Sequence, residues 1–118
     1  MNSSAPWGKS TSINLFECDR KKLTDPNAIK IFIQRVIKKV DMKAHGPCHI
    51  ERFGVGKLQG YSAIQFIETS SITVHCDEVG NRVFIDVFSC KNFDATRARN
   101  FAIKFFEAKR GSAVTLDR

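Results

Sequence analysis

The chain has 118 residues, of which 42% belong to the hydrophobic set, so residues 1–118 suit a single domain with one core and leave no room for two. Nineteen Lys and Arg against twelve Asp and Glu give a formal net charge of +7. Because the basic residues fall mainly on the polar faces and ends of expected helices, we interpret them as a solvated surface and expect neither a nucleic acid nor a membrane partner.

The N-terminus lacks the basic-then-apolar pattern of a secretory signal, so we expect a cytoplasmic protein. The four cysteines form no Cys-x-x-Cys pair, and their spacing supports neither a zinc site nor a redox dithiol.

The first third of the chain predicts a strand followed by a long helix. Residues 1–9 have the composition of a loose lead-in, and residues 11–18 alternate as a strand does. Thr24 or Asp25 can cap the free amides of a helix, and Pro26 suits its first turn. One apolar stripe then continues for about 16 residues at a spacing of three and four. The stripe consists of Ile29, Phe32, Ile33, Val36, Ile37 and Val40.

The rest of the chain predicts successive strands and one more helix. Gly46-Pro47 is expected to break the chain, and Gly80-Asn81 to turn it. Asp94 is expected to cap the second helix, which Gly111 would end. The strands expected after the first are 48–53, 61–68, 72–77, 82–90 and 113–116.

This order of elements predicts an α+β fold. Strand, helix, several strands joined by short turns, helix and strand fit an antiparallel sheet with two helices packed on one face, a two-layer sandwich. The other face would carry Phe84 and Phe88. A second copy of so short a chain is the simplest cover for them.

Three consecutive hydroxyl residues, Thr69, Ser70 and Ser71, precede the strand that holds His75. A strand interior gains little from such a triplet, because each buried hydroxyl needs a partner. The sequence contains no glycine-rich phosphate loop that opens a helix, no Gly-x-Ser-x-Gly and no His-Glu-x-x-His. The triplet is therefore the feature to explain.

The spacing of four residues, one of them in the hydroxyl triplet, resembles a known pattern that explains the triplet. Ser70 lies five residues before His75, Ser62 lies eight before Ser70, and Cys90 lies twenty after it. This pattern resembles the S-adenosylmethionine decarboxylase proenzymes of the small prokaryotic type, which make their own pyruvoyl cofactor. The resemblance extends more loosely from about Gly8 to the second expected helix.

The resemblance implies a cut between Thr69 and Ser70 that yields chains 1–69 (β) and 70–118 (α). Ser70 would become the pyruvoyl group, with Ser62 and His75 assisting the cut. The ketone would bind the substrate amine as a Schiff base and accept the electron pair left by carbon dioxide, a role no side chain can fill. Cys90 would then return a proton to the α-carbon. The expected enzyme decarboxylates S-adenosylmethionine to the aminopropyl donor for spermidine synthesis, as a homodimer of cleaved protomers.

The sequence departs from the family pattern at two places. Many members have Glu-Ser-His at the cut, where this chain has Thr69-Ser70-Ser71. After the histidine many continue Thr-Trp-Pro-Glu, whose glutamate binds the ribose; here Asp77 or Glu78 would take that role. Two alternatives stay open: a pyruvoyl enzyme that decarboxylates ornithine or arginine, and an inactive paralogue that acts as a basic binding module.

Overall fold

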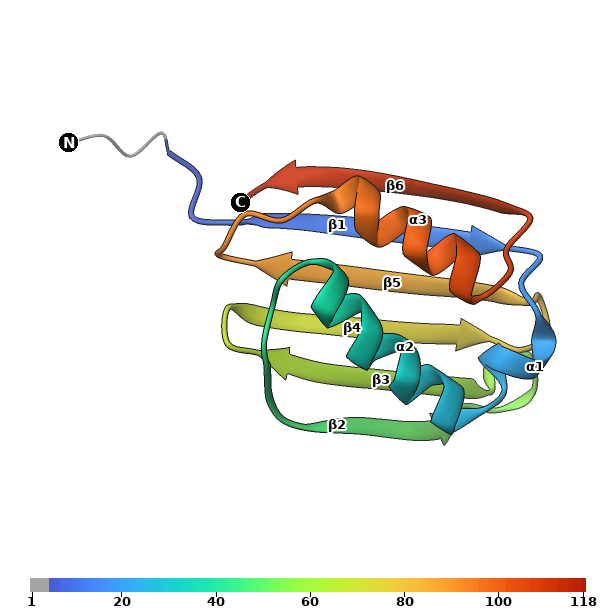
Figure 1. Ribbon diagram of the computed structural model, residues 1–118. Coiled ribbons are helices and arrows are strands. Elements are labelled where there is room, and N and C mark those ends of the chain that lie inside the picture. The colour runs from blue at the N-terminus through green and yellow to red at the C-terminus, as the bar shows by residue number, and fades with distance from the viewer. Residues whose placement is uncertain (1–4) are drawn as a thin grey trace.

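One twisted antiparallel sheet carries the three α-helices of the described residues on the same side (Figure 1). The computed structural model describes residues 5–118; the first four residues of the predicted lead-in lie outside them. The strand order is β2-β3-β4-β5-β1-β6, and every neighbouring pair is antiparallel. This confirms the predicted α+β sandwich. The elements are β1 (Lys9–Phe16), α1 (Arg20–Leu23), α2 (Pro26–Lys39), β2 (Ala44–Phe53), the 3-10 turn η1 (Gly56–Leu58), β3 (Gly60–Ile67), β4 (Ser70–Asp77), β5 (Arg82–Ser89), α3 (Ala95–Phe105) and β6 (Arg110–Asp117).

The predicted apolar stripe of α2 is buried against the sheet, as expected for a helix with one apolar face. Phe32 lies at the centre of the helix layer and is fully buried. Its ring centroid lies 5.7 Å from that of Phe101, 5.4 Å from Phe105 and 4.9 Å from Phe106, all in or next to α3. This aromatic cluster fixes the two long helices side by side over the sheet.

The helix α2 begins at the residue that the sequence predicts, because the predicted capping residue and proline are both in place. The Asp25 carboxylate accepts a hydrogen bond of 2.9 Å from the Asn27 N–H, and Pro26 takes the first helical position. Thr24, the alternative cap, instead ends the short helix α1, which Asp19 caps and the sequence does not predict. A helix of four residues is too short to leave a periodic pattern.

Both long helices end without glycine. After α2 the Met42 N–H donates to the Ile37 carbonyl at 2.9 Å, and Asp41 between them adopts φ +57°. The helix α3 ends in the same way, with Glu107 at φ +49°. This closure usually takes glycine, and another residue costs about 1 kcal/mol. Gly111 was wrongly expected to end α3: it lies in β6, where a Cβ would come within 2.7 Å of an α3 side chain.

Gly46-Pro47 interrupts the register of β2 without ending the strand. Ala44 pairs with Ile67, and pairing resumes at Cys48 with Gln65, so β2 has two more residues than β3 over this stretch. The buried Gln65 amide donates to the Gly46 carbonyl at 3.0 Å. The predicted break is wrong because β2 is an edge strand, where a bulge and a proline are tolerated.

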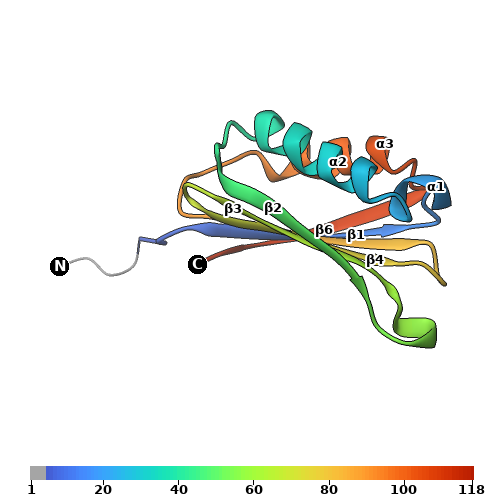
Figure 2. The same cartoon turned by 90° about the horizontal axis from the view of Figure 1, so that it is seen from below.

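The face of the sheet opposite the helices is open in the described chain (Figure 2). The Trp7 ring lies 5.7 Å from that of Phe88, which is half-buried. No helix within residues 5–118 is long and apolar enough to cross a membrane. Exposed apolar side chains on or beside the open face include Trp7, Phe53, Phe66, Val114 and Leu116.

Candidate active site

The structure divides the four candidate residues into two groups at different places along the strands. Ser70 begins β4 and pairs with Ser89 at the end of β5, next to Cys90. Ser62 and His75 pair with each other across β3 and β4. Ser70 and His75 lie five positions apart along β4, which corresponds to about 16 Å. One chain therefore does not bring the two groups together.

The peptide between Thr69 and Ser70 is held by the residue that follows β5. The Cys90 N–H donates a hydrogen bond of 2.9 Å to the Thr69 carbonyl oxygen, and the Cys90 thiol is exposed. Ser70 adopts φ +155°, a value rarely found outside glycine and most often at functional sites. A carbonyl oxygen that accepts a hydrogen bond from a fixed N–H draws electron density from its carbon, which makes that carbon easier for a nucleophile to attack.

The Thr69 hydroxyl is held as well. It accepts a hydrogen bond of 2.8 Å from the hydroxyl of Ser89, which is fully buried, and it donates to the Met42 sulfur at 3.4 Å. The Lys91 N–H donates to the Ser89 oxygen at 3.0 Å. The side-chain hydroxyl and the backbone carbonyl of Thr69 are thus both held by residues at the end of β5.

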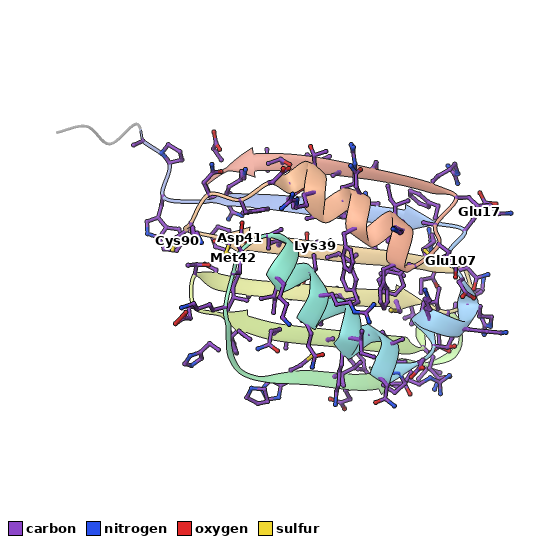
Figure 3. All side chains as sticks on the ribbon, in the orientation of Figure 1. Glu17, Lys39, Asp41, Met42, Cys90 and Glu107 are labelled. Carbon is purple, nitrogen blue, oxygen red and sulfur yellow. The ribbon has the colours of Figure 1, made fainter. Side chains whose placement is uncertain are left out.

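Segments far apart in sequence form the walls of this site. Cys90, Asp41 and Met42 lie together at one end of the sheet (Figure 3). The Lys91 ammonium donates to the Asp41 carbonyl at 2.7 Å, which ties the chain after β5 to the end of α2. Gly8 lies so close that a Cβ there would come within 2.5 Å of the Ser89 carbonyl oxygen. These contacts leave the site little freedom to shift.

Ser62 and His75 form a second polar pair on the open face of the sheet. The Ser62 hydroxyl lies 2.9 Å from His75 Nδ1 and donates to it when the ring proton is on Nε2. Val74 and Cys76 on either side of His75 are buried under the helices, so strand alternation turns His75 outward. The pair borders a shallow pocket of about 590 Å³. Other residues along this pocket are His49, Glu51, Phe53, Ile64 and Thr73.

Asp77 and Glu78, the two candidate substrate carboxylates, each contact an arginine. Asp77 accepts from Arg82 at 2.7 Å. Glu78 is buried and accepts two hydrogen bonds from Arg52, at 2.9 and 2.8 Å, while Arg20 donates to its backbone carbonyl. The Arg52 guanidinium holds the pKa of the Glu78 carboxyl below its usual value, against the effect of burial. Both carboxylates already have charge partners within the chain.

Cys90 is the one exposed thiol among the four cysteines, and all four are unpaired. Burial raises the pKa of Cys18 to about 11 and that of Cys76 to about 12, and it also raises the pKa of Cys48. Thiols with raised pKa values in apolar surroundings are poor acids and nucleophiles. Exposure therefore singles out Cys90 for chemistry.

Comparisons with known proteins decide the family. Residues 9–118 match the S-adenosylmethionine decarboxylase family. The chain belongs to this family. An S-adenosylmethionine decarboxylase proenzyme from Geobacillus kaustophilus (strain HTA426) is 25% identical over 111 residues, which cover 94% of this chain and 86% of that protein. The crystal structure of the adenosylmethionine decarboxylase from Aquifex aeolicus VF5 has the same fold: TM-score 0.81 and 19% identity, over 98% of this chain and 92% of that one.

Within this adenosylmethionine decarboxylase fold, sequence reasoning missed Ser89, Met42 and Arg52. Ser89 could have been found, because it falls on the buried side of β5 and stands next to Cys90. Met42 and Arg52 left no such signal, because they meet their partners Thr69 and Glu78 only in the fold.

We predict that Arg52→Met destabilises the fold in a pH-dependent way, because it leaves the Glu78 carboxylate buried without its partner. The native Glu78 pKa is lowered, so the pair stabilises the fold above the unfolded-state pKa of about 4.3. Its contribution is lost as the pH falls through the folded-state pKa. Urea unfolding should show a lower midpoint for the variant at pH 7 and a smaller difference below about pH 4.

Arg110→Met is the matched control, because it removes an ion pair with Glu17 in which both side chains are exposed. It should change the midpoint less than Arg52→Met does. Equal losses for the two variants at pH 7, or a loss for Arg52→Met that does not vary with pH, would contradict the role given to Glu78.

Proposed function

We propose that this enzyme cuts itself between Thr69 and Ser70, converts Ser70 into a pyruvoyl group and decarboxylates S-adenosylmethionine to the aminopropyl donor for spermidine synthesis. One observation carries the proposal: the Cys90 N–H holds the Thr69 carbonyl beside Ser70, and the exposed Cys90 thiol follows on the same residue. The unpaired cysteines support a reducing compartment such as the cytoplasm.

The self-cleavage uses groups of the chain alone. The Ser70 hydroxyl oxygen attacks the Thr69 carbonyl carbon, the C–N bond breaks, and the hydroxyl proton ends on the Ser70 nitrogen, which leaves an ester. Negative charge develops on the Thr69 oxygen during the attack, where the Cys90 N–H stabilises it. Loss of the Ser70 α-proton then expels Thr69 as a carboxylate, and water replaces the nitrogen of the resulting dehydroalanine with a ketone oxygen, releasing ammonia.

The residues at the start of β4 fit this group, since its precursor Ser70 stands at a constrained backbone position beside a free thiol. The pyruvoyl group supplies an electron sink for the pair left when carbon dioxide departs. Cys90 then protonates the substrate α-carbon from its Sγ atom. The exposed position of the thiol leaves room for a substrate next to it.

The separation of the two residue groups supports a homodimer whose sites use both copies. Ser62 and His75 lie on the open face, where apolar side chains such as Phe66 and Leu116 are exposed. Two copies packed face to face about a twofold axis that exchanges the strand ends would bring the Ser62–His75 pair of one chain to the start of β4, where Ser70 lies, in the other. His75 would then exchange protons in the cut made by its partner.

The alternative substrates ornithine and arginine are favoured by one observation. Asp77 and Glu78 are engaged by Arg82 and Arg52 rather than free to accept ribose hydroxyls. However, the family that residues 9–118 match is that of S-adenosylmethionine decarboxylase. S-adenosylmethionine therefore stays the first choice, and direct assay decides.

The cut itself is tested by intact mass. The purified chain should separate under denaturing conditions into pieces 1–69 and 70–118, with a carbonyl in place of the amine at residue 70. Ser70→Ala should stay whole and release no carbon dioxide, because alanine has no attacking oxygen. A wild-type chain with an intact amide between Thr69 and Ser70 under all conditions would rule out the pyruvoyl mechanism.

The role of Cys90 is tested by release of labelled carbon dioxide from S-adenosylmethionine, ornithine and arginine in parallel. Turnover should be seen with S-adenosylmethionine. Cys90→Ala should still cut itself, because its backbone N–H remains, but turn over about 10²-fold more slowly or worse for want of a proton donor. Normal turnover by the variant would remove Cys90 from the mechanism, and turnover of only a basic amino acid would reject the first substrate.

Shared sites are tested by co-expression of Ser70→Ala with His75→Ala. Each variant alone should remain largely uncut. In mixed dimers the His75→Ala chain keeps its Ser70 and meets an intact His75 on its partner, so this chain alone should be cut. The measurement is the mass of each chain, with sedimentation to verify the dimer. No rescue in verified mixed dimers would place both groups in one chain.

A further inference from the structure

Ser89 is a fully buried hydroxyl that the chemistry above does not use. It lies on the helix side of β5, where Val83, Ile85 and Val87 precede it, and it pairs with Ser70 across the β4–β5 ladder. A valine would suit this position by packing alone. A buried hydroxyl persists where it has partners.

Its partners form a line that passes through the Thr69 side chain, next to the peptide of the proposed cut, and ends at Met42. The Lys91 N–H donates to Ser89 at 3.0 Å, Ser89 donates to the Thr69 hydroxyl at 2.8 Å, and Thr69 donates to the Met42 sulfur at 3.4 Å. Ser89 also lies 3.7 Å from the same sulfur, a longer and weaker contact. Each hydroxyl in the line therefore accepts one hydrogen bond and donates one.

Two consecutive residues thus act on Thr69 at two different atoms. The Ser89 side chain holds its hydroxyl, and the Cys90 N–H holds its carbonyl oxygen. One hydrogen bond alone would let the peptide plane between Thr69 and Ser70 rotate about it, whereas two fix its orientation. The unusual φ of Ser70 lies directly next to this anchored plane.

We infer that the Ser89 and Thr69 hydroxyls are positioning groups that hold the 69–70 peptide for attack by the Ser70 oxygen. This inference rests on the proposed self-cleavage. The hydroxyls act on the first step, in which the bond from Ser70 Oγ to the Thr69 carbon forms, the carbon–nitrogen bond breaks and the hydroxyl proton moves to nitrogen. A small displacement of the carbonyl slows such a step strongly.

The test follows self-cleavage of the full chain by intact mass after cell-free synthesis. Ser89→Ala and Thr69→Val each remove one hydroxyl and should slow the cut at least about tenfold. Ser89→Thr and Thr69→Ser keep the hydroxyl and should cut within about threefold of the wild-type rate. The double variant Ser89→Ala/Thr69→Val should be no slower than the worse single variant, because both changes break the same bond.

Hydroxylamine separates positioning from a later defect. It attacks the ester carbonyl at Thr69 and releases Ser70 with its hydroxyl, so it cuts every chain that has completed the first step. The slow variants should stay uncut in its presence, because they fail before the ester forms. Rapid cutting by hydroxylamine would place the defect at elimination and overturn the inference.

Thr11→Val is the matched control. Thr11 is also fully buried and accepts a hydrogen bond of 3.0 Å from the Thr115 hydroxyl, between β1 and β6. This variant should cut at the wild-type rate. Thermal unfolding identifies any variant that fails to fold, and the half-buried Thr69→Val then carries the test if Ser89→Ala is lost.

If folded Ser89→Ala or Thr69→Val cuts itself at the wild-type rate, this inference is overturned while the proposed function stands. The cut would then proceed without the hydrogen bond between the two hydroxyls. A Thr11→Val chain slowed as much as these two would do the same, because the effect would not be specific to the site. An uncut wild-type chain would overturn the proposed function and this inference with it.

Discussion

The hydrogen bond from the Cys90 N–H to the Thr69 carbonyl is the contact on which the candidate site depends. It joins the turn between β3 and β4 to the end of β5 and so brings the peptide of the proposed cut beside the exposed thiol. The β4–β5 register sets it, since Ser70 lies opposite Ser89. A slip by one residue would turn the buried side chains of a strand to solvent. The apolar core of the whole sheet therefore fixes this one bond.

The same rigid sheet keeps Ser62 and His75 away from Ser70 in their own chain. Within a ladder of paired strands, five residues cannot fold back, so no side-chain rotation closes a gap of about 16 Å. If a second copy supplies the pair, as we propose, self-cleavage waits for assembly. A chain that has not yet found its partner would then keep Ser70 as an ordinary serine.

Sequence patterns predicted the parts of the fold that local chemistry decides. Alternation located the strands, because one face of the sheet is buried and the other open, and Asp25 with Pro26 located the start of α2. The failures at Gly46-Pro47 and Gly111 have one cause: tertiary packing let an edge strand absorb a bulge and let Glu107 close a helix. The family spacing selects Ser70 and Cys90, but it cannot show that Met42 reaches Thr69 from 27 residues away.

Several departures from local preference meet at the end of the sheet that holds the proposed cut site. Asp41 is left-handed, Ser70 has φ +155°, and Ser89 buries a hydroxyl. Such departures persist only where the surroundings hold them. The closure of α2 at Asp41 carries Met42 under Thr69, so the first of these departures supports the others. In the proposed reaction the cut frees the Ser70 backbone, while Thr69 becomes a carboxylate facing the Cys90 N–H. A charged acceptor makes a stronger hydrogen bond than a carbonyl. The contact that begins the reaction would therefore afterwards hold the pieces 1–69 and 70–118 together.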